Sequence, residues 1–143
     1  MDYQSRFTIE LVAPKERSVC EYPEIPEQEN REYPIALLAE KGDCTYISKA
    51  KNGHKLGARV VFVSLRDPNE DPEEIIPIAP KKQSVDVPPV VVISKKSGDE
   101  IREVLSRGER IFLSVDFDLV TNRIKISKKD MMLLLMSKFG LNC

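Results

Sequence analysis

Two segments far apart in the chain alternate apolar and polar residues with a period of two. Residues 6–12 (RFTIELV) and residues 110–118 (RIFLSVDFD) both show this pattern. A period of two predicts a strand with one buried face and one face toward solvent. Residues 123–127 (RIKIS) form a shorter β-prone stretch. We therefore expect half-buried strands near both ends of the chain.

Three other segments are almost continuously apolar. They are residues 35–39 (IALLA), 59–65 (RVVFVSL) and 90–94 (VVVIS). Runs of this kind are typical of central strands that are buried on both faces, as in a parallel sheet. Together with the alternating and β-prone segments, they give six predicted strands.

A helical period separates the first two apolar runs. Residues 45–56 carry Tyr46, Ile47, Ala50 and Gly53 at three- and four-residue steps, which indicates a short helix with small residues where it meets the sheet. Gly57 suits a left-handed stop after the last turn. The unit of strand, helix and strand over about 30 residues is βαβ-like.

Two further helices are predicted downstream. Ser97 is expected to cap the first, with Glu100 completing a capping box, and Gly108 is expected to end it. Residues 129–139 form the second, which is strongly apolar. We expect that helix to dock either on this domain or on a segment absent from the chain.

Proline and charge mark two irregular segments. Residues 13–33 contain three prolines among many charges and are expected to form a loop. Residues 66–86 form a long acidic loop with four prolines, in which 74–78 could be a brief strand. A loop of this length is often functional or mobile. A solvated connector remains an equal alternative.

Composition excludes some classes of protein. The chain has 143 residues, 41% of them hydrophobic and 31% charged, which fits one globular domain. The net charge of −1 favours neither nucleic acid nor an anionic membrane as a partner. No apolar run approaches the roughly 20 residues that cross a bilayer. The first residues do not read as a secretory signal, so the chain is either cytosolic or a mature fragment.

The chain has three cysteines, Cys20, Cys44 and Cys143. They are either free thiols or one disulfide and a leftover cysteine. A bridge between Cys20 and Cys44 would close a loop of about 25 residues, contribute roughly 3 kcal/mol to stability and imply an oxidising compartment. Without a CxxC pair, and with only His54 as a nitrogen ligand, a zinc site is not expected.

No catalytic or metal-binding group emerges from the residues. A nucleophilic pair of Cys44 and His54 would span about 15 Å along a helix, so the two side chains could not touch. The acidic residues of the long loop lack the spacing of an EF-hand calcium site, and a solvated acidic loop is the preferred interpretation. That acidic set is Asp67, Glu70, Asp71, Glu73 and Glu74.

Two blocks of sequence carry a resemblance to a known family. The first is LAEKGDC at residues 38–44, followed by Tyr46, Lys49-Ala50, Asn52 and Gly57-Ala58; the second is VPPVVVIS at residues 87–94, followed by Gly98 and Ile101. In this order and separation they resemble the protease-associated (PA) domain. The likeness is greatest to the PA domain of vacuolar sorting receptors and covers residues 7–118.

The resemblance implies a fold and a class of function. The expected fold is α/β, with a β-sandwich or open barrel flanked by two or three short helices. PA domains have no catalytic activity and no cofactor, and they bind peptides or proteins in the lumen of the secretory, endolysosomal or vacuolar system or outside the cell. The alternative is an accessory domain of a larger protease or transmembrane ubiquitin ligase. In either case the chain would belong to a longer protein, which could be membrane-anchored.

The resemblance also implies specific residues. It pairs Cys20 with Cys44 in a disulfide. It assigns ligand binding to the turn Lys41, Gly42 and Asp43 and to the long loop, here Arg66 and Asp67. Lys41 departs from the family's usual Arg, which replaces a bidentate fork by a point charge. Gly53 departs from the commoner Ala, at a helix cost of up to about 1 kcal/mol.

The resemblance divides the chain in two. Residues 1–118 are expected to form the PA-like domain. Residues 119–143 are expected to form a strand–helix extension, which either docks on that domain or begins a following one. In the second case Cys143 would have its partner outside the chain.

Overall fold

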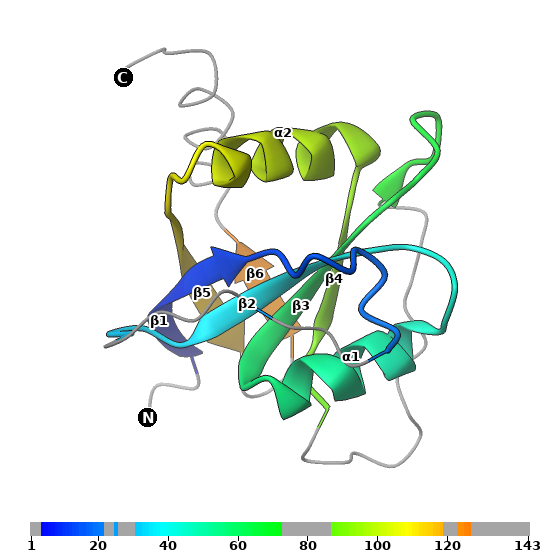
Figure 1. Ribbon diagram of the computed structural model, residues 1–143. Helices are drawn as coiled ribbons and strands as arrows, with labels where there is room; N and C mark the ends of the chain where they lie inside the picture. Colours follow the sequence, from blue (N-terminus) through cyan, green and yellow to red (C-terminus); the bar gives the residue numbers. More distant parts are fainter. Residues whose placement is uncertain (1–3, 22–24, 26–30, 73–86, 119–122, 127–143) are drawn as a thin grey trace.

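A single mixed sheet organises the computed structural model, which describes residues 4–21, 25, 31–72, 87–118 and 123–126. Its order is β4-β3-β2-β1-β5-β6. The strands are β1 (Gln4–Val12), β2 (Ile35–Glu40), β3 (Ala58–Ser64), β4 (Val90–Ile93), β5 (Ile111–Asp118) and β6 (Arg123–Ile126). Helix α1 (Tyr46–Lys55) covers one face and helix α2 (Lys95–Ser106) the other (Figure 1). The predicted fold class is confirmed in its open-barrel form, because the described strands make one sheet.

The apolar runs form the parallel half of the sheet. β2 pairs in parallel with β1 on one side and with β3 on the other, and β3 pairs in parallel with β4. α1 returns the chain from the end of β2 to the start of β3, so the predicted βαβ unit is confirmed. β5 and β6 are antiparallel additions beyond β1. The six predicted strands are therefore all present.

The two faces of the sheet bury separate cores, as expected for strands covered on both sides. Side chains toward α2 form one cluster: Ile9, Leu11, Ala36, Leu38, Val60, Phe62, Ile93, Ile101, Val104, Ile111, Leu113 and Val115. Side chains toward α1 form the other: Val12, Val19, Ile35, Leu37, Ala39, Ala58, Val61 and Val63. Neighbouring residues of β2 and β3 alternate between the clusters, which is why the interiors of these strands are almost continuously apolar.

The start of α2 corrects one prediction. Ser94, not Ser97, is the N-cap, and its side chain accepts a hydrogen bond from the Ser97 backbone N–H. α2 therefore begins directly after β4, and Glu100 lies buried in the middle of the helix instead of in a capping box. The two predicted glycine stops are confirmed: Gly57 follows α1 with a φ of +84° and Gly108 follows α2 with a φ of +81°. Thr45 caps α1.

Glycines let both helices approach the sheet closely. A Cβ added at Gly53 would lie 2.6 Å from Val61 Cγ2, and one added at Gly98 would lie 2.4 Å from Ser64 Cβ. The interpretation of small residues at the helix–sheet contact is therefore confirmed. At Gly98 the contact also brings Arg102 of α2 to Ser64, where Arg102 Nη1 donates to Ser64 Oγ at 2.9 Å.

A buried carboxylate in β1 forms ion pairs with two arginines outside that strand. Glu10 of β1 is 4% exposed and accepts two hydrogen bonds from Arg110, at 2.8 and 3.0 Å, and one from Arg31 at 3.0 Å. The hydrogen bond from Arg110 is the main reason that the pKa of Glu10 is lowered. The pairings connect β1 to the residue that precedes β5 and to the segment that precedes β2.

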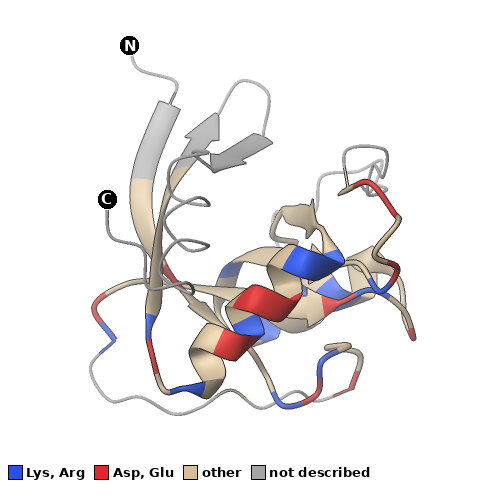
Figure 2. Cartoon of the chain, turned by 90° about the horizontal axis from the view of Figure 1, so that it is seen from above, with Lys and Arg blue, Asp and Glu red and all other residues tan. Residues whose placement is uncertain are grey.

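Some predictions fall outside the described residues. They are the brief strand at 74–78, the helix at 129–139 and the environment of Cys143. Within the described segments, no helix is both long and apolar enough to span a bilayer. Basic and acidic residues interleave along α2 and do not gather into a patch of one sign (Figure 2).

Gly98→Ala should destabilise the fold. Helix propensity alone favours alanine by up to about 1 kcal/mol. Overpacking against Ser64 should outweigh this and lower the free energy of unfolding by about 1–3 kcal/mol in urea denaturation. Lys96→Ala, on the exposed side of α2, is the control and should be nearly neutral. A Gly98→Ala variant at least as stable as wild type would contradict the close contact.

Glu10→Gln should reduce the dependence of the free energy of unfolding on pH. The folded pKa of Glu10 is below the ordinary 4.5, so its ion pairs stabilise the fold above that pH and are lost as the pH falls through the lowered value. At pH 7 the variant should lose about 1–3 kcal/mol in urea denaturation. Its loss of stability between neutral and acid pH should be smaller than that of wild type. Glu109→Gln, an exposed control, should keep the wild-type slope.

Candidate functional site

The predicted turn lies at the carboxyl end of the parallel strands. Lys41 follows β2, and its backbone N–H donates to the Ser64 carbonyl, at the end of β3, at 2.9 Å. Arg66 follows two residues later, so the turn and the loop after β3 share one edge of the sheet. In open α/β sheets this edge is the usual place for a ligand.

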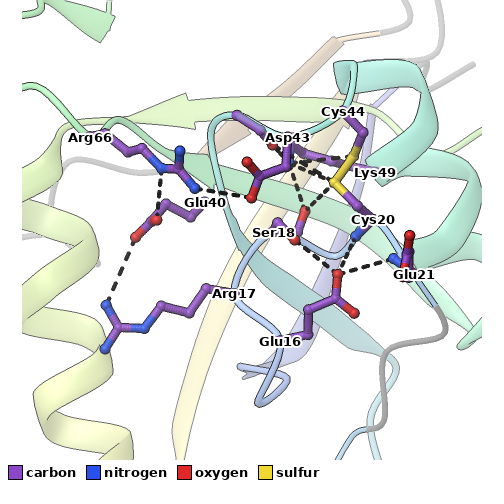
Figure 3. A network of polar contacts seen from close by, with 11 residues as sticks. Glu16, Arg17, Ser18, Cys20, Glu21, Glu40, Asp43, Cys44, Lys49 and Arg66 are labelled. Atoms are coloured by element: carbon purple, nitrogen blue, oxygen red, sulfur yellow. Dashed lines mark hydrogen bonds and ion pairs between the residues drawn. A yellow bond between two sulfur atoms is a disulfide. The ribbon is translucent and has the colours of Figure 1, made fainter.

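A buried lysine supports the turn from below. Lys49, in α1, is fully buried, and its Nζ donates to the carbonyl oxygens of Ser18 at 2.6 Å and Gly42 at 2.7 Å (Figure 3). The same Nζ lies 3.6 Å from the Sγ atoms of both Cys20 and Cys44. Burial lowers the pKa of Lys49, with the Asp43 charge acting in the opposite direction. One ammonium thus connects the turn to the segment before Cys20.

A disulfide makes the same connection covalently. Cys20 and Cys44 are joined with a Cα–Cα distance of 5.8 Å, which is the pairing that the family resemblance implies. The Glu16 carboxylate organises the Cys20 side, where it accepts hydrogen bonds from Ser18 Oγ and from the backbone N–H groups of Cys20 and Glu21. These bonds, the one from Ser18 first, lower the pKa of Glu16.

The backbone beside the disulfide is strained. Val19 is a buried, β-branched residue with a φ of +56°, a conformation that such residues rarely adopt. Asn52 of α1 holds it, because its Nδ2 donates to the carbonyls of Val19 at 2.9 Å and Cys20 at 3.1 Å. Strain of this kind persists only where the surroundings over-determine it.

Arg66 crosses the outer side of the turn. Its Nε donates to Glu40 at 2.9 Å and its Nη2 to Asp43 at 3.2 Å, and these partners raise its pKa, the hydrogen bond to Glu40 most. Gly42 makes room for it, since an added Cβ would lie 2.7 Å from Arg66 Nη1 and φ at Gly42 is +108°. Side chains of Asp43 and Arg66 remain 61% and 49% exposed, so both ions face solvent.

A second ion pair links the turn to the following loop. Lys41 Nζ lies 2.9 Å from Glu70 Oε2, and this hydrogen bond is the first cause of the raised pKa of Lys41. Asp67 lies in the same loop, but its Oδ1 accepts a hydrogen bond from the Asn69 N–H at 2.9 Å. Asp67 therefore shapes the loop, and its charge acts on Lys41 from a distance.

The structure brings Lys41, Gly42, Asp43 and Arg66 together, with Asp67 beside them. Sequence reasoning gave no role to Lys49, Glu16 or Glu40. A signal for Lys49 was available, because steps of three and four residues from Tyr46 place Lys49 on the buried face with Ala50 and Gly53. No local pattern marks Glu16, and Glu40 lies in the LAEKGDC block without an assigned role.

The same geometry bears on a Cys44–His54 nucleophile and on a metal site. Cys44 is held in the disulfide, so it cannot act as a nucleophile together with His54 in this state. Among the described residues, no three His, Cys, Asp or Glu side chains are grouped as a metal site requires. Glu73 and Glu74 of the acidic set lie outside those residues.

The comparisons with known proteins point to sorting receptors. No family model matches the chain. Vacuolar-sorting receptor 3 of Arabidopsis thaliana is 29% identical over 89 residues, and vacuolar-sorting receptor 1 of Pisum sativum is 27% identical over 89 residues. Each match covers 59% of this chain and 14% of the receptor. The chain is therefore similar to one region of these receptors.

A solved structure has a similar fold. An aminopeptidase from Aneurinibacillus sp. strain AM-1 superposes with a TM-score of 0.54 and 19% sequence identity, over 76% of this chain and 24% of that chain. At this identity the likeness concerns the fold alone. It supports the α/β open-barrel fold of this chain.

Asn52→Ala should loosen the segment before the disulfide. The change leaves the Val19 and Cys20 carbonyls without their donor and removes the support of the strained φ of Val19. We expect a loss of about 1–3 kcal/mol in urea denaturation. Backbone N–H exchange should accelerate in residues 16–21 more than in β3. Lys51→Ala, exposed on the same helix, should change neither measurement.

Proposed function

We propose that the chain is a non-catalytic module that binds a peptide or protein through Lys41, Gly42, Asp43, Arg66 and Asp67. The observation that carries this proposal is the Asp43–Arg66 ion pair, which is exposed on a turn that Lys49 and the disulfide hold in place. A fixed backbone with charged side chains toward solvent suits recognition, because little ordering is required on binding. No cofactor enters this mechanism.

Exchange of ion-pair partners is the proposed binding step. An exposed pair such as Asp43–Arg66 is weak because solvent screens it, so a ligand can open it at small cost. A peptide ammonium would replace Arg66 on Asp43. A carboxylate of the peptide would replace Asp43 on Arg66, where the guanidinium offers bidentate geometry. Arg66 would keep its hydrogen bond to Glu40 throughout.

In this proposal the binding site has two parts, the turn at residues 41–43 and the loop after β3. The Lys41–Glu70 pair connects that loop to the turn, so a ligand that engages Lys41 also shifts Glu70. Asp67 contributes through the loop shape that it stabilises at Asn69. The peptide would lie in an extended conformation between the turn and this loop, with backbone amides of the turn bonding its polar groups.

A luminal, sorting-type receptor is the proposed setting. The similarity to vacuolar sorting receptors supports it, as does a disulfide, which persists in oxidising compartments. The chain spans 14% of those receptors, so a membrane anchor and any further domains would lie elsewhere in a longer protein.

A second function is favoured by the likeness to the aminopeptidase fold. The domain would then orient substrate or regulate activity within a larger protease or transmembrane ubiquitin ligase. A protease motif or a RING finger in a longer chain that contains these residues would select this alternative.

Substitution at Asp43 should weaken peptide binding. Peptides with a free N-terminus, selected from a random library against this chain, would be compared with their acetylated forms by fluorescence polarisation. Asp43→Ala should raise Kd at least about tenfold for the free form, a difference of about 1.4 kcal/mol. The same variant should change Kd little for the acetylated form. Arg66→Ala should weaken both forms of peptides that carry a carboxylate near the N-terminus.

The matched control is Lys96→Ala, an exposed change on α2 away from the turn. It should leave Kd unchanged. Unaltered binding by both Asp43→Ala and Arg66→Ala would refute the proposed surface. Failure to select any peptide above background would contradict the peptide-binding function itself.

A further inference from the structure

The Lys49 ammonium lies against the disulfide as a buried charge. It is 3.6 Å from each sulfur, and among the described residues no carboxylate forms an ion pair with it. Two carbonyl oxygens accept hydrogen bonds from it but do not neutralise its charge. A buried ammonium without a counter-ion favours any nearby group that can become negative. The two sulfurs are such groups once the disulfide is opened.

We propose that the Cys20–Cys44 pair is a thiol–disulfide exchange site, in which Lys49 stabilises the Cys44 thiolate that leaves when a small thiol or a protein dithiol attacks Cys20. Both cysteine residues are partly exposed to solvent, which the approach of a thiol requires. The proposed substrate class is therefore a thiol reductant. The disulfide in this view is a reactive bond as well as a structural one.

The two sulfurs differ in their surroundings, which sets the direction of attack. Cys44 precedes the N-cap of α1, so its sulfur lies near the positive end of the helix, where thiolates are favoured. Cys20 Sγ lies 3.6 Å from the Ser18 carbonyl oxygen and 3.7 Å from that of Gly42. The Glu16 carboxylate also binds the Cys20 N–H. Negative partial charges around Cys20 disfavour a thiolate there.

The other charged groups near the disulfide influence the Cys44 thiolate less than Lys49 does. Glu16 precedes the disulfide, and Glu40 and Asp43 belong to the end of β2 and the turn. Arg66 neutralises Glu40 and Asp43, with which it is paired. Lys49 is the cation in direct contact with sulfur, and burial protects its charge from solvent screening.

The exchange proceeds in two balanced steps. A reductant thiolate attacks Cys20 Sγ, a mixed disulfide forms, and the electron pair of the broken S–S bond leaves on Cys44 Sγ beside Lys49. A second thiol then attacks the mixed disulfide and releases Cys20, which takes up a proton. Two reductant thiols are oxidised to one disulfide, the protein disulfide is reduced, and one proton goes to solvent while Cys44 stays a thiolate.

Reduction would loosen the connection between residues 16–21 and the turn, since the covalent link between them is lost. The hydrogen bonds from Lys49 and Asn52 would remain, as would the one from the Glu40 N–H to the Arg17 carbonyl. An effect on ligand affinity rests on the proposed function, whereas the exchange chemistry does not. The two proposals can therefore fail separately.

The first test is a thiol titration of the reduced protein, with Cys143→Ser in all samples so that two thiols remain. Alkylation by iodoacetamide is followed against pH for Cys20 and Cys44 by peptide mass spectrometry. Cys44 should titrate at least about one unit below the ordinary thiol value of about 8.5. Titration of Cys44 at or above that value would overturn the proposal.

The second test gives the direction of attack. The oxidised protein is treated with glutathione as the probe thiol and quenched with iodoacetamide. Glutathione should be found on Cys20 and the alkyl group on Cys44. Glutathione mainly on Cys44 would overturn the assigned leaving group.

The third test isolates the lysine. Lys49→Met should slow reduction by glutathione at neutral pH about tenfold, because the leaving thiolate loses its ammonium. Lys51→Met, exposed on the same helix, should reduce at the wild-type rate. An unchanged rate in folded Lys49→Met would refute the role of Lys49. If that variant does not fold, the titration of the Lys49-containing protein still decides the question.

Discussion

The hydrogen bonds of the buried Lys49 ammonium are the constraint on which the candidate site depends. They join α1, the Gly42 carbonyl and the Ser18 carbonyl at one point beneath the turn. Without these bonds the ammonium would lose the two carbonyl oxygens that hydrogen-bond it, and the cost of its desolvation would rise. The positive φ angles at Val19, Gly42 and Asp43 occur around this point, where the disulfide and Asn52 add further restraint.

The interactions around the turn, at the carboxyl end of the parallel strands, form two groups of different strength. Those beneath the turn are buried, and removing one partner would leave another polar group unsatisfied. Those above it, between Arg66, Asp43 and Glu40 and between Lys41 and Glu70, are exposed and individually weak. A rigid backbone with exchangeable ion pairs on its surface is a suitable arrangement for binding a charged peptide, and it is the physical basis of the proposed function.

Much of the fold was predictable, because the apolar runs and the alternating strands leave few alternatives for a sheet covered on both faces. The start of α2 was not, since Ser94 and Ser97 are both acceptable caps by sequence. The structure selects Ser94 because β4 ends at Ile93 and the chain turns there. At the site, the family resemblance indicated Lys41, Gly42, Asp43, Arg66 and Asp67. Periodicity places Lys49 on the buried face of its helix, but its contacts with the Ser18 and Gly42 carbonyls form only in the folded chain.

The sequence by itself determined the order of strands and helices, the two-sided burial of the central strands and the turn that follows β2. These depend on periodicity and on local backbone preference, which neighbouring residues set. Only the tertiary structure decided that Lys49 is buried beneath the turn and that Arg66 crosses Gly42. It also decided that Glu10 pairs with Arg110 across 100 positions. Such contacts form only when the folded segments pack together. Burial then removes water from these groups and strengthens the interactions between them.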